Sequence, residues 1–325
     1  MIRAADAAGL AEAVRLLKAG SVVGMPTETV YGLAADAFKP GACARVFEVK
    51  ARPAFDPLIV HLASAEWLPR VAAEIPPAAR ALAAAFWPGP LTLVLPRRPE
   101  VPGIVTAGLG TVAVRVPAHP VALALLALAD TPLAAPSANR FGALSPTRAQ
   151  HVVLGLGALV PLVLDGGPCR VGVESTIVDL SGPAATLLRP GGLAREDIEK
   201  VLGAPLADGP GALERPNAPG QLAAHYAPST PLRLLARPPA PDTGDRNRGL
   251  LAFQAAPERH HYGHVEILSV RGDLNEAAAR LFDCLHRLDG LRLESIDAER
   301  APAAGLGVAI NDRLGRAASG HATMA

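Results

Sequence analysis

The sequence of 325 residues is poor in the features that mark several protein classes. It has three cysteines, Cys43, Cys169 and Cys284, which lie far apart without a CxxC pair, so neither a zinc site nor a disulfide framework is expected. The net charge is +1, which provides no overall attraction to nucleic acid or membrane. The longest apolar run, residues 121–129, is about half a membrane span. These absences favour an untargeted protein of the reducing cytoplasm.

The sequence also lacks a standard phosphate-binding loop. There is no GxxxxGK[ST] motif, and the single GxGxxA match, residues 108–113, leads into an expected strand instead of a helix. Lysine is scarce as well, because 27 of the 31 basic residues are arginine. Because lysine is so scarce, Lys50 is a residue of interest. Because the motif is absent, a nucleotide would have to be bound in another way.

Half of the residues are hydrophobic, which is enough for two domains with substantial cores. Helical and extended patterns alternate over the first two hundred residues, with more strands than helices, which predicts an α/β domain with a twisted mixed sheet and flanking helices over residues 1–203. Residues 204–231 are dense in Pro and Gly and are predicted to form a linker. A second α/β pattern predicts a smaller, Rossmann-like domain over residues 232–325.

Polar residues of the first domain gather where the expected strands and helices end. Thr29 and its neighbours follow one strand, His61 lies within the apolar run PLIVHL, and residues 136–147 (PSANRFGALSPT) follow another strand. Loops at strand ends are where α/β proteins place ligands. Several such clusters in one domain predict a polar cavity lined from several strands.

Charge indicates what could fill this cavity. Lys50, Arg52, Arg115 and Arg189 each lie in or beside a cluster, and converging cations suit a polyphosphate together with a carboxylate. Small donors could complete the cradle: Ser137, Asn139, Ser145, Ser175 and Thr176. Taken singly, each residue has a structural explanation. Hydroxyls cap turns, Arg115 could lie on a solvated sheet face, and His61 could be a core histidine.

Seven ordered segments carry a family resemblance. They are MPTETVYGLAADAF, KARPAFDPLIVHL, FWPGPLTLVLPRR, VAVRVPAHP, APSANRFGALSPT, DGGPCRVGVESTIVDL and LLRPGGL. They closely resemble the threonylcarbamoyl-AMP synthase family, the YrdC-type enzymes. The resemblance continues through APGQLAAHYAP and GLGVAINDRLGRAA, as in the long, two-domain form.

This resemblance implies a cytoplasmic nucleotidyltransferase. Its reaction would convert L-threonine, bicarbonate or CO₂, and ATP into threonylcarbamoyl-AMP and pyrophosphate, with Mg²⁺ accompanying ATP. A tRNA threonylcarbamoyl transferase complex would then carry the group to the adenosine beside the anticodon. No membrane partner and no tight tRNA binding are implied.

The resemblance also assigns residues. Lys50 and Arg52 would be the catalytic cations, and no protein ligand for a metal is assigned. The threonine-binding set would be Thr29, His61, Arg115 and Ser175. The ATP-binding set would be Lys50, Arg52, Asp56, Thr111, Ser137, Asn139, Ser145, Arg189 and Tyr226, the last carried by a linker that closes as a lid. Asp56 departs from the neutral residue expected there, and its charge would repel phosphate unless a cation compensates.

Two other functions remain open at the level of sequence. The fold could serve as a double-stranded RNA-binding module, because recognition of RNA shape requires little sequence signature. A related carbamoyl-adenylate enzyme with another acceptor is the second, although such enzymes usually carry further domains for which this chain has no room.

Overall fold

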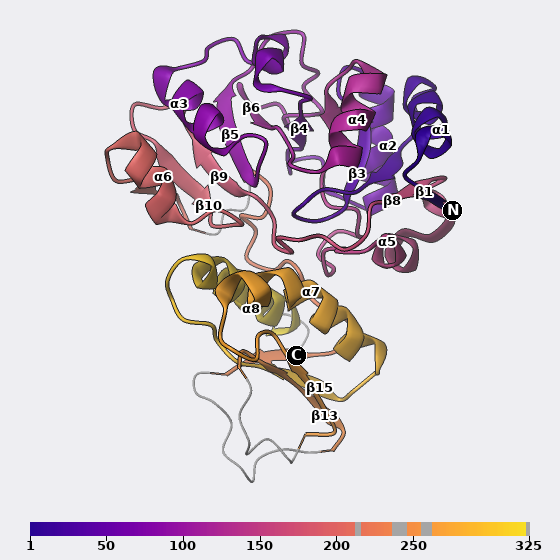
Figure 1. The fold of residues 1–325 in the computed structure, drawn as a ribbon, viewed down its shortest axis with the longest axis vertical. Coiled ribbons are helices and arrows are strands. Elements are labelled where there is room, and N and C mark those ends of the chain that lie inside the picture. The colour runs from indigo at the N-terminus through magenta and orange to yellow at the C-terminus, as the bar shows by residue number, and fades with distance from the viewer. Residues whose placement is uncertain (212–215, 236–245, 255–261, 323–325) are drawn as a thin grey trace.

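The computed structural model describes residues 1–211, 216–235, 246–254 and 262–322. Two sheets with flanking helices make up this part of the chain, as Figure 1 shows. The large sheet and its helices lie at the top of that view, and the small sheet lies at the bottom. Helices α7 (Leu274–Gly290) and α8 (Leu306–Ala322) lie between the small sheet and the large part.

The large sheet has eleven strands in the order β1-β8-β2-β3-β7-β4-β6-β5-β9-β10-β11 and mixes parallel with antiparallel pairs. Their bounds are β1 Ile2–Ala4, β2 Val23–Met25, β3 Gly32–Asp36, β4 Ile59–His61, β5 Leu91–Pro96, β6 Thr111–Arg115, β7 Leu133–Ala134, β8 Val163–Asp165, β9 Thr176–Asp179, β10 Thr186–Arg189 and β11 Ala207–Asp208.

The helices of this part follow the capping rules of their sequences. The carboxylate of Asp6 accepts a hydrogen bond from the Gly9 N–H at 2.8 Å, and Pro40 opens a helix at its first position. Gly203 ends the last helix in the left-handed region, with φ of 66°. The bounds are α1 Ala7–Lys18, α2 Pro40–Lys50, α3 Pro77–Phe86, α4 Pro120–Ala129, α5 Ala149–Leu156 and α6 Arg195–Leu202, with 3₁₀ turns η1 Ala65–Arg70 and η2 Gly157–Leu159.

The small sheet has four parallel strands in the order β12-β15-β13-β14. Their bounds are β12 Leu232–Leu234, β13 Arg248–Ala252, β14 His264–Ile267 and β15 Ser295–Ala298. Asp273 caps α7 by accepting a hydrogen bond from the Glu276 N–H at 2.8 Å. A parallel sheet covered by α7 and α8 is the Rossmann-like arrangement that the sequence predicts.

The two parts share a hydrophobic core. The apolar cluster of the small part includes Val30, Leu144 and Val173 of the large part. At Gly172, with φ of 76°, an added Cβ would lie 2.4 Å from the carbonyl oxygen of Ala278 on α7. Only glycine permits so close an approach between backbones, so the two parts pack directly on each other.

The predicted α/β class with a mixed sheet is confirmed. Within the predicted linker, residues 204–231, strand β11 pairs with β10 and extends the large sheet, and residues 212–215 lie outside the described part. The domain bounds themselves remain a prediction. Among the described residues, no helix is long and apolar enough to cross a membrane.

Candidate active site

A buried polar cavity is lined by residues of β3, β4, β6 and β10, by loops beside these strands and by the linker. Eight of the residues assigned from the sequence line it: Thr29, Arg52, His61, Arg115, Ser137, Ser175, Arg189 and Tyr226. The sequence places them far apart, and the sheet order brings them together because β4 and β6 are paired in the middle of the sheet. Three guanidinium groups and several hydroxyls therefore face one space.

The residues after β2 form a chain of hydroxyls. Thr27 Oγ1 donates to the carbonyl oxygen of Val30 at 2.6 Å, and Thr27 Oγ1 and Thr29 Oγ1 lie 2.9 Å apart. Because the proton of Thr27 is committed to Val30, the Thr29 hydroxyl donates to Thr27. Arg115 Nη1 in turn donates to Thr29 Oγ1 at 2.9 Å. The Thr29 oxygen is thereby held in a single orientation at the cavity.

Arg115 is fixed on three sides. Besides Thr29, its Nε donates to the carbonyl oxygen of Gly89 at 3.1 Å, and its Nη2 forms an ion pair with Glu28 Oε1 at 2.6 Å. Both charged side chains are buried. A planar guanidinium held in this way is suited to bind a small carboxylate through its remaining N–H groups.

His61 lies on β4 beside Arg115, and the two are register partners across β4 and β6. Burial and the charge of Arg115 lower the pKa of His61 to about 3. Its Nδ1 is buried, and no described residue forms a hydrogen bond with it. His61 is thus a neutral imidazole whose ring lines the cavity, which suits a hydroxyl or amine and not a charged partner.

Arg189 connects β9 to the linker. Its Nη2 donates to the carbonyl oxygen of Ser175 at 2.9 Å and to Ser175 Oγ at 3.2 Å, and its Nη1 donates to the carbonyl oxygen of Pro219 at 3.0 Å. Ser175 Oγ also lies 2.7 Å from Thr92 Oγ1. Arg189 therefore joins the wall of the cavity to the segment that covers it.

Lys50 is buried but does not line the cavity. Its Nζ donates to the carbonyl oxygens of Ser137 and Asn139, both at 2.5 Å, and lies 3.4 Å from Asn139 Oδ1. Burial, with a contribution from the charge of Arg52, holds the pKa of Lys50 well below its usual value. In this arrangement Lys50 fixes the loop that carries Ser137.

Asp56 is compensated by a neighbouring cation. Arg52 Nη2 lies 2.9 Å from Asp56 Oδ1, and Arg52 also donates to the carbonyl oxygens of Asp56 and Pro57. Burial raises the pKa of Asp56, and the charge of Arg52 opposes that rise. Asp56 does not line the cavity, whereas Arg52 does. Arg52 is therefore the cation that compensates the charge of Asp56.

Three further residues of the predicted ATP set lie outside the cavity lining. Thr111 begins β6, Asn139 donates through Nδ2 to the carbonyl oxygens of Arg140 and Ala143, and Ser145 Oγ lies 2.5 Å from Glu174 Oε1. Their direct contact with a nucleotide remains a prediction.

The linker fills much of the cavity. Pro219, Gly220, His225 and Tyr226 line it, and Tyr226 is buried to 1% exposure with a left-handed backbone at φ of 64°. The remaining space is about 40 Å³, whereas small-molecule pockets typically measure about 300–1,000 Å³. A nucleotide can enter only when this segment moves.

Sequence reasoning missed two side chains at this site. His225, beside the assigned Tyr226, lines the cavity, and burial holds its pKa well below the ordinary value. Arg313, on α8, pairs with Glu174 at 2.6 Å. A periodic arginine in a helix of a second domain gives no signal that it reaches the first. His225 could have been found from its position directly before the assigned Tyr226.

The donor set of the described residues does not favour a protein-bound metal. No group of three or more His, Cys, Asp or Glu side chains is placed to hold a metal ion within the described ranges. Glu174 is the carboxylate at the cavity, and Arg313 and Ser145 already occupy its two oxygens.

The fold is a two-part α/β arrangement, and its enclosed cavity gathers guanidinium groups and hydroxyls, a donor set suited to a small polar anion. Comparisons with known proteins make this more specific. Residues 15–191 match the Sua5_yciO_yrdC family model, described as Telomere recombination, and residues 193–319 match that of the Threonylcarbamoyl-AMP synthase, C-terminal domain.

Similar full-length proteins agree with these matches. The threonylcarbamoyl-AMP synthase of Pyrococcus abyssi is 43% identical over 95% of this chain and 93% of its own length, and that of Bacillus subtilis is 41% identical over 96% and 93%. The crystal structure of P. abyssi Sua5 complexed with L-threonine superposes with a TM-score of 0.87 at 40% identity, covering 96% of this chain and 94% of that one. The chain belongs to the threonylcarbamoyl-AMP synthase family.

Proposed function

We propose that this chain is a nucleotidyltransferase that forms threonylcarbamoyl-AMP and pyrophosphate from L-threonine, bicarbonate or CO₂, and ATP. The observation that carries the proposal is the convergence of Arg52, Arg115 and Arg189 with the hydroxyls of Thr29, Ser137 and Ser175 on one buried cavity. Family membership and the threonine complex of the P. abyssi relative support it.

The chemistry requires alignment more than a strong base. The neutral amine of threonine attacks CO₂, and a proton leaves the nitrogen to give a carbamate. A carbamate oxygen then attacks the α-phosphorus of ATP, and the bond to pyrophosphate breaks. Because a carbamate is a weak nucleophile and both the carbamate and ATP are anionic, positioning and charge neutralisation supply most of the acceleration.

The threonine subsite is proposed around Arg115. Its guanidinium binds the carboxylate, while Thr29 and Ser175 offer hydroxyls fixed by the contacts described above. The neutral ring of His61 meets the uncharged part of the amino acid, since its low pKa keeps it unprotonated at neutral pH. A site that hydrogen-bonds the threonine hydroxyl rejects analogues that lack it far more strongly than those that lack only a methyl group.

The nucleotide subsite is proposed between Arg52 and Arg189, with Ser137 and Tyr226. Lys50 contributes by holding the loop of Ser137 and Asn139 in place. Mg²⁺ arrives with the phosphates of ATP, as is usual for an ion that binds through phosphates and water. It would offset charge on the departing pyrophosphate.

The linker is proposed to act as a lid. Pro219, Gly220 and Tyr226 lie over the cavity, and Arg189 grips the Pro219 carbonyl. Covering the site protects a mixed anhydride that water would hydrolyse. The lid would open for ATP and close over the product.

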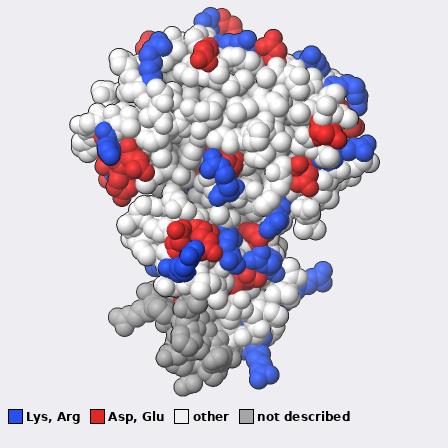
Figure 2. Space-filling model, viewed as in Figure 1, with Lys and Arg blue, Asp and Glu red and all other residues white. Residues whose placement is uncertain are grey.

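The product is proposed to pass to a tRNA threonylcarbamoyl transferase complex in the cytoplasm. On the face shown in Figure 2, basic and acidic side chains lie beside each other and form no basic stripe. That face therefore offers little to a phosphate backbone, which favours a synthase over the double-stranded RNA-binding alternative.

The test is pyrophosphate release by the purified protein with MgATP and bicarbonate, with the nucleotide product identified by mass. L-threonine is compared with L-serine, which lacks the methyl group, and with L-2-aminobutyrate, which lacks the hydroxyl. Release that depends on threonine, with a threonylcarbamoyl adenylate as product and the least turnover with 2-aminobutyrate, supports the proposal. A folded protein that binds ATP but shows no such turnover refutes it.

A further inference from the structure

We propose that Arg313, on helix α8 of the small domain, is a positioning residue for the reaction proposed above, on which this inference rests. It neutralises Glu174 inside the cavity and holds the lid residue Tyr226 against the cavity wall. The small domain thereby completes the active site of the large one.

The geometry places Arg313 between three segments of the site. Its Nε lies 2.6 Å from Glu174 Oε2, and its Nη2 donates to the carbonyl oxygen of Pro190 at 3.0 Å. The guanidinium carbon lies 5.0 Å from the centre of the Tyr226 ring, within the range of a cation–π contact. Its side chain is fully buried, so these contacts are made away from water.

The charge of Glu174 makes this contact matter for an anionic substrate. Glu174 lines the same cavity as Arg189 and Ser175. Burial raises its pKa, but Arg313, Arg189 and the Ser145 hydroxyl together outweigh that effect and hold the pKa below its usual value. An ionised carboxylate without Arg313 would repel the phosphates of ATP at short range.

Neighbouring groups of α8 extend the same contact to the lid. Asp312 pairs with both Arg313 and Arg316. Arg316 donates to the carbonyl oxygen of Leu222, and its own carbonyl accepts the N–H of His225 at 3.3 Å. One face of α8 thus binds the linker at Leu222 and His225, within the stretch that covers the cavity.

A purely structural role explains these contacts less well. The domains already share an apolar core, and Gly172 packs backbone to backbone on α7. A buried ion pair seldom adds stability over apolar side chains of similar size. The Arg313–Glu174 pair lies beside the cavity and contacts the lid, and this location indicates a role in the reaction.

The test uses the full chain and four variants at the pair. These are Arg313→Met, Arg313→Lys, Glu174→Gln and the double variant Glu174→Gln with Arg313→Met. The matched control is Arg280→Met, which removes a surface pair with Glu276 on α7 of the same domain. Circular dichroism and thermal unfolding verify that each variant folds. The readouts are kcat and KM for ATP, affinity for a non-hydrolysable ATP analogue, and activity from pH 5.5 to 9.

Arg313→Met is expected to lose about 100-fold in kcat/KM for ATP, since breaking a buried pair leaves a charge behind. Its activity relative to the unaltered chain should rise as the pH falls, because protonation neutralises Glu174. The double variant should recover most of the loss, Arg313→Lys part of it, and Arg280→Met should match the unaltered chain.

Three results would overturn the inference. They are unchanged ATP kinetics in a folded Arg313→Met protein, a double variant no better than the single one, and a relative pH profile that stays flat. If the unaltered chain makes no threonylcarbamoyl-AMP, the proposed function fails. The affinity for the ATP analogue across the same variants still decides whether Arg313 controls the charge of the cavity.

Discussion

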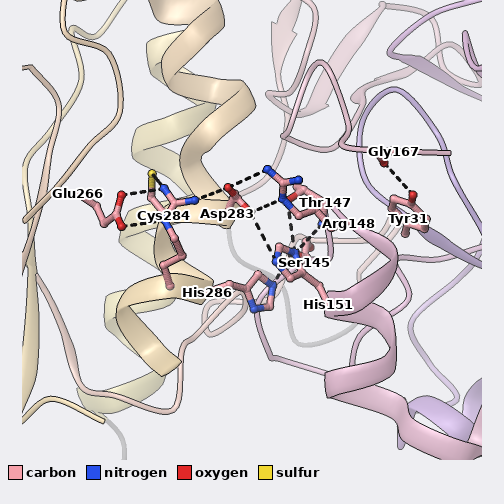
Figure 3. Close-up of polar contacts among 11 residues, drawn as sticks. Tyr31, Ser145, Thr147, Arg148, His151, Gly167, Glu266, Asp283, Cys284 and His286 are labelled. Carbon is pink, nitrogen blue, oxygen red and sulfur yellow. Dashed lines mark hydrogen bonds and ion pairs between the residues drawn. The ribbon is translucent and has the colours of Figure 1, made fainter. Parts of the chain in front are cut away.

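His151 of α5 stacks on His286 of α7 across the domain interface, with ring centres 3.9 Å apart and planes inclined by 25°. Figure 3 shows the surrounding contacts. The Thr147 N–H donates to His151 Nδ1 at 3.3 Å, His286 Nε2 lies 3.1 Å from the Ser145 carbonyl oxygen, and Asp283 lies 3.6 Å from His151 Nε2. Two neutral rings stack well, whereas two imidazolium ions would repel.

The first prediction concerns the stability of the fold at acidic pH. Burial, with a contribution from His286, lowers the pKa of His151 to about 3, and burial also lowers that of His286. Arg148 and Arg287 oppose protonation of His151, while Asp283 favours it. In the unfolded chain both titrate near pH 6.5. The contribution of the two neutral rings to the free energy of unfolding is therefore complete above pH 6.5. It is lost as the pH falls below 6.5, by about 1.4 kcal/mol per pH unit for each neutral ring.

The measurement is the free energy of unfolding in urea at pH 7.5, 6.5 and 5.5, compared with His286→Gln, which keeps an N–H donor. The variant should lose less stability on acidification than the unaltered chain. Equal losses in both would show that the stacked pair does not govern the acid response.

The second prediction concerns the lid. A Cβ at Gly220 would lie 2.7 Å from Tyr226 Oη and 2.9 Å from Arg189 Cδ, and the backbone φ of 84° is itself unfavourable for alanine. Gly220→Ala should displace the lid, lower kcat at least about 10-fold and speed proteolysis within the linker. Gly182→Ala is the control, because its added Cβ meets no atom within 4 Å. Identical proteolysis and turnover of the two variants would refute this role of Gly220.

The third prediction separates the two subsites. Arg115→Lys keeps a positive charge beside Glu28 but cannot reproduce a planar fork toward a carboxylate. KM for threonine should rise about 10- to 100-fold while KM for ATP changes little. Arg189→Lys should raise KM for ATP more than KM for threonine, because Arg189 faces the lid and the nucleotide subsite and also holds Ser175. Equal changes in both constants for each variant would contradict the assignment.

The fourth prediction concerns Lys50. Replacing it with Met leaves the carbonyl oxygens of Ser137 and Asn139 without their buried donor. The free energy of unfolding should fall by about 2 kcal/mol, and KM for ATP should rise because the Ser137 loop shifts. Lys200→Met, at an exposed position on α6, serves as the control. A loss of ATP affinity with unchanged stability would instead indicate direct contact with phosphate.

Much of the fold follows from sequence periodicity. Pro40 and the pattern after it predict a helix to about Lys50, and α2 has those bounds; the runs LTLVL and TVAVRV predict strands, and β5 and β6 form there. Strand β3 was not predicted, because GLAAD has neither alternation nor β-branched residues. Its strand conformation depends on pairing with β2 and β7, which are distant from each other in sequence.

The candidate site likewise has residues that the sequence indicates and contacts that it cannot indicate. Residue type and position near strand ends drew attention to Arg115, Arg189 and Thr29, and the family resemblance assigned them to ligands; the structure brings all three to one cavity. Residue type alone could not show that the donors of Lys50 are consumed by backbone carbonyls. Nor could it show that Arg313 contacts Glu174, which is 139 residues away in the sequence, because a long-range contact leaves no local pattern.

The close packing at Gly172 limits how substrates can travel. Since the backbone of α7 leaves no room for even a methyl group there, an opening between the two domains would have to break this contact. If the linker is the proposed lid, access to the cavity depends on a short stretch of chain ending at Tyr226. The rate of product release would then be set by the linker, and single substitutions there could change it without weakening the contact between the domains.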